Sequence, residues 1–170
     1  MKVKKLIICL LFVLYVFLAL NLLFFIRASM LRFYTYGEYF RENTNFLPFR
    51  TVIEFIGYIR ERNMYYLELS RDNLVGNLLI FMPFGVFLPA LWKKQRRFVS
   101  FLLTASAVIT GVEIIQFITM CGACDIDDFI LNIAGAVTGF AFTRINMIKR
   151  LMFTDVSLKK ENRNEKLRKF

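Results

Sequence analysis

Four long apolar segments limit what this chain can fold into. Residues 6–26 and 73–92 carry no charged side chain, residues 98–119 carry only Glu113, and residues 127–148 are charged only near their ends. A helix needs about 20 mostly apolar residues to cross a bilayer, whereas the helices of a soluble domain alternate apolar and polar faces. The sequence therefore predicts an all-α integral membrane bundle of four transmembrane helices.

Composition excludes several classes of protein. The chain has 170 residues, of which 57% are hydrophobic, with a net charge of +10 and no histidine. It is too apolar for a disordered arm that binds nucleic acid, and without histidine it can build neither a Ser-His-Asp triad nor an HExxH zinc site. We expect no nucleic-acid partner, no metal site and no cofactor.

Positive charge is distributed unevenly about the apolar segments. Sixteen of the 23 Lys and Arg residues lie at the N-terminus, in residues 93–97 and from Arg144 onward. The other seven lie in residues 27–72, where six acidic residues nearly neutralise them. Because cytoplasmic loops are enriched in Lys and Arg, we predict cytoplasmic termini, including a basic tail at 151–170, and an outer loop at 27–72. The excess charge then lies beside anionic lipid.

One part of the predicted outer loop has helical periodicity. Between residues 48 and 60, apolar side chains fall on one stripe, formed by Val52, Phe55, Ile56 and Ile59. The pattern predicts a short amphipathic helix, which either lies in the outer membrane interface or packs on the outer end of the bundle.

Uncommon polar side chains recur at a similar depth in the outer halves of three predicted spans. At about 1.5 Å of rise per residue, Asn77, Glu113 and Asn132 lie roughly 6 to 9 Å below the outer ends. Polar groups inside a bilayer are costly unless they are partnered, so we predict one shared pocket that opens outward. Its predicted ligand-binding residues are Asn73, Asn77, Glu113, Gln116, Asp125, Asp127, Asp128 and Asn132. The alternative is that these residues only form hydrogen bonds between helices.

Two further patterns concern helix shape and packing. Gly135 and Gly139 are spaced for close contact between helices. Pro83 predicts a kink in the second span and a freed carbonyl near Leu79. Gly85 is expected to ease that bend.

The pair Cys121 and Cys124 forms a CxxC motif between the third and fourth spans. A disulfide is permitted outside the membrane, and the sequence leaves open whether the two thiols are oxidised.

Several motifs, taken together, resemble one known family. Residues 125–139, Asp-Ile-Asp-Asp-Phe-Ile-Leu-Asn-Ile-Ala-Gly-Ala-Val-Thr-Gly, resemble the C-terminal signature of the VanZ-like membrane protein family. Residues 73–85, 113–116 and 45–49 resemble its central, third-span and outer-loop motifs, in the family's order. The resemblance covers about residues 5 to 150. It implies a protein of the bacterial cell membrane linked to low-level resistance to teicoplanin, a lipidated glycopeptide.

Three functions are compatible with these features. The first, which we predict, is non-enzymatic binding of an envelope lipid, a cell-wall precursor or a lipoglycopeptide in the polar pocket. The second is a membrane-embedded enzyme in which Glu113 is a general acid or base and Asp125, Asp127 and Asp128 hold a hard cation. The third is an ion or solute pathway, which the apolar inner half of the bundle disfavours.

Overall fold

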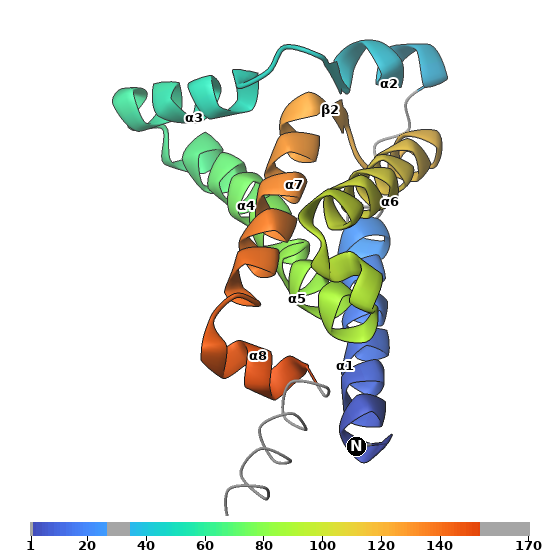
Figure 1. Cartoon of the computed structure of the whole chain (residues 1–170). Helices are drawn as coiled ribbons and strands as arrows, with labels where there is room; N and C mark the ends of the chain where they lie inside the picture. Colours follow the sequence, from blue (N-terminus) through green and yellow to red (C-terminus); the bar gives the residue numbers. More distant parts are fainter. Residues whose placement is uncertain (1, 27–34, 154–170) are drawn as a thin grey trace, which may run out of the picture.

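Helices that run between the two ends of the molecule make up most of the fold (Figure 1). This computed structural model describes residues 2–26 and 35–153. In chain order, the elements are α1 (Lys2–Leu20), the π-helix η1 (Asn21–Ile26), α2 (Tyr36–Glu42), β1 (Thr44–Asn45), α3 (Arg50–Glu61), α4 (Met64–Ile80), α5 (Met82–Leu91), the 3-10 helix η2 (Lys93–Arg96), α6 (Phe98–Ile118), β2 (Cys124–Asp125), α7 (Ile126–Phe142) and α8 (Asn146–Met152).

The predicted multi-pass helical membrane fold is confirmed. Within the described residues, the helical stretches Val3–Phe24, Met64–Leu91 and Phe98–Ile118 are long and apolar enough to cross a membrane. The bent pair α7 and α8 adds a fourth crossing if the two helices count as one span. The N-terminus and α8 lie at one end of the molecule, whereas α2 and α3 lie across the other (Figure 1).

The second span begins earlier than the apolar count indicated. The uncharged stretch starts at residue 73, because Glu68, Arg71 and Asp72 precede it, yet the helix begins at Met64. Charged side chains at the end of a span reach toward the interface and do not interrupt the backbone hydrogen bonds. The loop predicted as residues 27–72 therefore ends near residue 63. Its described part, residues 35–63, is called the capping segment below.

The predicted kink in this span is confirmed. The helix breaks at Phe81 between α4 and α5, and Pro83 lies in the first turn of α5. Proline has no backbone N–H to donate. Beside the break, the Tyr15 hydroxyl of α1 donates a hydrogen bond to the Ile80 carbonyl at 2.9 Å.

The fourth span ends sooner than predicted. The sequence predicted a helix over 127–148, but α7 ends at Phe142 and the chain bends by 91° into α8. The Thr143 hydroxyl donates to the Phe140 carbonyl at 2.6 Å, which satisfies a carbonyl of the last turn. Arg144 follows the turn and lies over the Phe140 ring, 4.8 Å from its centroid. The basic tail lies outside the described residues beyond Phe153.

The predicted amphipathic helix is present as α3. It packs against α4, and the rings of Tyr58 and Tyr66 stack across this contact with centroids 5.3 Å apart. Of the predicted stripe, Phe55 is half-buried, whereas Ile56 and Ile59 are exposed. The helix therefore rests on the end of α4 and leaves part of its apolar face uncovered by the described residues.

Helix α7 occupies the centre of the bundle, where it packs against α4, α5 and α6. The predicted glycine contact is confirmed, because a Cβ on Gly135 or Gly139 would lie 1.9 Å from the carbonyl oxygens of Leu78 and Met82. Gly85 has the same role from α5: its Cβ would lie 2.0 Å from the Ala136 carbonyl oxygen. It therefore serves close packing between α5 and α7.

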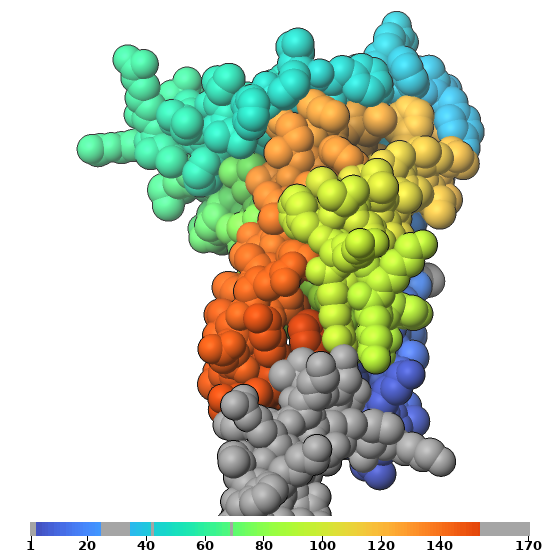
Figure 2. All heavy atoms as spheres, viewed as in Figure 1, coloured from blue at the N-terminus to red at the C-terminus, as the bar shows by residue number. Residues whose placement is uncertain are grey.

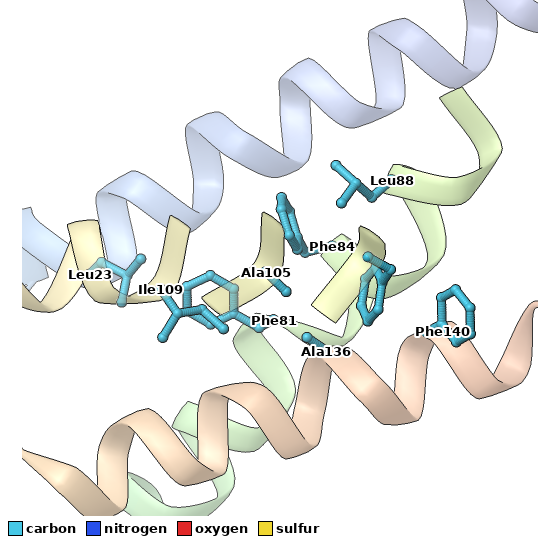
Figure 3. Packing of buried hydrophobic residues seen from close by; sticks show 9 residues of the cluster. Leu23, Phe81, Phe84, Leu88, Ala105, Ile109, Ala136 and Phe140 are labelled. Carbon is cyan, nitrogen blue, oxygen red and sulfur yellow. The ribbon is translucent and has the colours of Figure 1, made fainter. Parts of the chain in front are cut away.

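Apolar side chains from α5, α6 and α7 fill the space between the helices (Figure 3). Phe101, Ala105 and Ile109 of α6 are fully buried. The rings of Phe101 and Phe140 stack with centroids 4.5 Å apart. This packing fixes the position of the central helix between its neighbours.

Replacement of Gly139 by alanine is expected to destabilise the bundle. The new Cβ would force α7 away from α5, and overpacking of this kind costs about 1–3 kcal/mol. Thermal unfolding in detergent micelles measures the change as a lower Tm. Gly111→Ala is the matched control, because a Cβ there meets no atom within 4 Å. An equal fall in Tm for both variants would contradict the packing argument.

Candidate functional site

The polar side chains of α7 connect this helix to α4 on one side. Asp128 Oδ1 accepts hydrogen bonds from Asn73 Nδ2, at 3.2 Å, and from Asn77 Nδ2. Asn77 also donates to Asn73 Oδ1 at 3.3 Å. Asn77 and Asp128 are each only 3% exposed. Three of the predicted site residues therefore form one buried cluster between α4 and α7.

A second contact connects α7 to α6. Asn132 Nδ2 donates a hydrogen bond to Glu113 Oε1 at 3.0 Å. Asn132 is 1% exposed, and its buried Oδ1 has no hydrogen-bond partner among the residues that the structure describes. The pair joins α6 to α7 toward the C-terminal end of α6 and the N-terminal end of α7.

Gln116 lies one turn from Glu113 but binds a different part of the molecule. Its Nε2 donates to the Leu23 carbonyl of η1 at 2.8 Å, and the side chain is almost completely buried. The bond satisfies a carbonyl of the irregular π-helix and attaches α1 to α6.

Asp127 and Asp125 bind the capping segment. Asp127 accepts hydrogen bonds from the backbone N–H groups of Phe49 and, at 2.7 Å, of Thr51. Phe49 has a φ of 65° and provides no side-chain cap for α3. The carboxylate of Asp127 therefore caps the N-terminus of α3 from another helix, at the end where a negative charge is favourable.

Asp125 adds further bonds to the same segment. It accepts from Asn45 Nδ2 and Thr51 Oγ1, both at 3.0 Å, and caps α7 through the N–H of Asp127 at 2.8 Å. The parallel pairing of β1 with β2 places Asn45 opposite Asp125. The segment consequently covers the end of α7 (Figure 2), and Asp127 is 2% exposed.

The three predicted acids thus face different partners. Asp128 faces α4, whereas Asp125 and Asp127 face the capping segment. In the described part of the chain, no group of three or more His, Cys, Asp and Glu side chains could hold a metal ion.

A cavity of about 320 Å³ lies beside Glu113. Phe46, Phe117 and Phe129 line it together with Glu113 and Asp125, and its wall is mostly apolar. The three phenylalanines were not among the predicted site residues. Phe117 and Phe129 follow Glu113 and Asp125 by four residues, and this helical spacing was the available signal.

Cys124 also lines this cavity. All three cysteines of the chain are free thiols. Burial raises the pKa of the Cys124 thiol, and the negative charges of Glu113 and Asp125 raise it further. The thiol therefore stays protonated and is a poor nucleophile near neutral pH.

The sequence pattern of the VanZ/LLP1 family matches residues 12–149, which include every residue of the two polar contacts and of the cavity. The chain belongs to the VanZ/LLP1 family. No curated protein and no solved structure matches it. This VanZ/LLP1 protein is a multi-pass membrane protein whose family region covers all the helices that line the site.

Asp127→Asn is expected to loosen the capping segment. An amide keeps one acceptor oxygen but loses the charge and one acceptor, and loss of a helix cap costs about 1 kcal/mol. Hydrogen exchange of residues 45–51 should speed up several-fold, whereas Asp72→Asn, at an exposed carboxylate, should leave it unchanged. Unchanged exchange in Asp127→Asn would contradict the capping role.

Alkylation of Cys124 is expected to begin at a lower pH in Glu113→Gln. Removal of one negative charge lowers the pKa of the thiol, although burial keeps it above its ordinary value. The rate of iodoacetamide labelling against pH, in a variant with Cys9→Ser and Cys121→Ser, measures the shift. Glu54→Gln is the control at an exposed carboxyl group. If Glu113→Gln and the control give the same profile, Glu113 does not act on the thiol.

Proposed function

We propose that this VanZ/LLP1 protein binds an amphiphilic envelope molecule, without converting it, in the cavity between α6 and α7. The ligand is a membrane lipid, a cell-wall precursor or a lipoglycopeptide that carries an amine. The observation that carries the proposal is the carboxyl group of Glu113 in the wall of a mostly aromatic and aliphatic cavity, with Asn132 bound to it.

The chemistry of the wall supports a ligand that combines a cation with an apolar body. Glu113 is the proposed partner of an ammonium group, and charge-assisted hydrogen bonds of this kind are strong, while Asp125 adds a second negative charge at the wall. The rings of Phe46, Phe117 and Phe129 offer apolar surface to the rest of the ligand, and a ring face turned to the cation would add cation–π attraction. Asn132 does not line the cavity, but its Nδ2 holds Glu113 in place from α7.

The other predicted site residues contribute to the proposed site through position. Asp127 holds the capping segment, which supplies Phe46. Asp128, Asn73 and Asn77 fix α7 against α4, and Gln116 attaches α1. The Asp127 contact thus acts on a wall of the cavity directly, and the other contacts fix α6 and α7, which carry the rest of its wall, within the bundle.

The proposed setting is the bacterial cell membrane with both termini in the cytoplasm. The charge distribution supports it, since the N-terminus, η2 and α8 carry the basic clusters and the N-terminus and α8 lie at one end (Figure 1). The cavity, which is lined by Phe46 of the capping segment, then lies toward the outside. Such a position favours contact with lipoglycopeptides such as teicoplanin.

A matched pair of amphiphiles tests the proposal. Dodecylamine and dodecanol differ only in the charged group, and the protein in nanodiscs should bind the amine at least tenfold more tightly, by about 1.4 kcal/mol. Glu113→Gln should abolish this preference, and Asn132→Ala should weaken it. Glu54→Gln, at an exposed carboxyl group, should not change it. Teicoplanin is the third probe.

Equal Kd values for the amine and the alcohol in the wild-type protein would contradict the proposal. So would a preference that Glu113→Gln leaves intact. Release of a product from a lipid substrate, lost in Glu113→Gln while the protein stays folded, would support the enzymatic alternative instead.

A further inference from the structure

A second cavity, of about 430 Å³, lies between α1 and α4 and is here called the α1–α4 groove. Leu18 and Leu22 line it from the first span, and Gly76, Leu79 and Pro83 line it from the second. Leu18, Leu22 and Leu79 are about half exposed, so the groove opens on the side of the bundle where a bilayer would surround it.

The groove exists because α1 packs mainly against α5. The Phe87 ring of α5 contacts Phe12 and Tyr15, with centroids 5.7 and 5.8 Å away. Toward the C-terminal end of α1, Gly76 of α4 has no side chain that could pack against the first span. A Cβ on Gly76 would meet no atom within 4 Å. The aromatic contact between α1 and α5 and the missing side chain at Gly76 therefore leave space between α1 and α4.

Charge is confined to one end of the groove, where Asp72 is the one charged residue among the described residues that line it. On α4, Asp72 lies at one end, Gly76 follows one turn later and Leu79 lies deeper, and Pro83 follows in the first turn of α5. From Asp72 to Pro83, the helix rises about 16 Å. One leaflet of the hydrocarbon core is about 15 Å thick, half of about 30 Å. The groove, from Asp72 to Pro83, thus has about the length of one leaflet of the hydrocarbon core.

Charged groups at the shallow end complement a phosphate and an ammonium group. Arg71 donates from Nε and Nη2 to Asp72 Oδ1 at 3.0 and 2.8 Å. A guanidinium has five N–H donors, so Arg71, which is largely exposed, keeps donors for a phosphate. The Asp72 carboxylate is 69% exposed, and Glu68 lies one helical turn before it.

We propose that the α1–α4 groove binds a phospholipid whose headgroup carries both a phosphate and a primary ammonium group. One acyl chain lies along Leu18, Leu22 and Leu79, the phosphate contacts Arg71, and the ammonium group contacts Asp72 and Glu68. This site shares none of its residues with the cavity beside Glu113, so the inference does not depend on the function proposed above.

Photo-crosslinking in liposomes tests the groove. The probe is phosphatidylethanolamine with a diazirine in one acyl chain, and mass spectrometry locates the labelled residues. Labelling of Leu18, Leu22 and Leu79 should exceed that of Leu103, an exposed leucine of α6, at least threefold. Gly76→Leu, which fills the groove, should reduce it at least fivefold. Gly111→Leu is the matched control at an open glycine of α6.

Headgroup chemistry is tested with a second probe. The second probe is phosphatidylglycerol with the same diazirine-bearing acyl chain. Its headgroup has the phosphate but no ammonium group, so this lipid should label the groove several-fold less. Asp72→Asn should remove this difference, and Arg71→Gln should weaken labelling by both lipids. Thermal unfolding checks each variant, and Ala19→Leu, on the α1 wall, replaces Gly76→Leu if that variant unfolds.

Three results would overturn the inference. One is labelling of the groove no greater than that of Leu103, which indicates bulk lipid only. Another is labelling that neither Gly76→Leu nor Ala19→Leu reduces. The third is a crosslink across the groove to a second copy of the chain, which would make the groove a dimer interface. The preference of the Glu113 cavity for an amine is measured in a separate experiment. A negative result for the groove is therefore distinguishable from a negative result for the cavity.

Discussion

The close packing of α7 between its neighbours is the constraint on which the rest of the structure depends. Gly135 and Gly139 let the backbone of α7 touch that of α4 and α5, and one turn apart on the same helix Asp128 and Asn132 bind α4 and α6. Inside a bilayer, polar groups must find their partners within the protein. The small residues set the distance between the helices and the polar residues set their register, so both act together to hold three helices in one arrangement.

That arrangement separates the polar residues into two kinds of contact. Asp127, Asp128 and Gln116 bind chain segments, and these bonds fix the capping segment, α4 and α1. Glu113, by contrast, lines a cavity and is held from α7 by Asn132. Residues of both kinds lie within the part of the chain that matches the family.

The sequence predicted the features that depend on local pattern. Apolar length identified the spans, Pro83 identified the kink, and Gly135 with Gly139 identified the close contact. The ends of the helices were less predictable. A charged residue such as Asp72 interrupts an apolar stretch of sequence, yet the helix continues through it. The capping of α3 by Asp127 could not be predicted, since its partners are 76 and 78 residues away and are backbone N–H groups that any sequence supplies.

The hydrogen bond between Asn132 and Glu113 connects the packing of α7 to the proposed site, and a double-mutant cycle tests it most directly. The free energies of unfolding in bicelles of the wild type, Asn132→Ala, Glu113→Ala and the double variant give the coupling between the two side chains. Couplings of this kind between transmembrane helices average about 0.6 kcal/mol and reach about 1.7. The account predicts a coupling of at least about 0.5 kcal/mol, and strictly additive effects would contradict it.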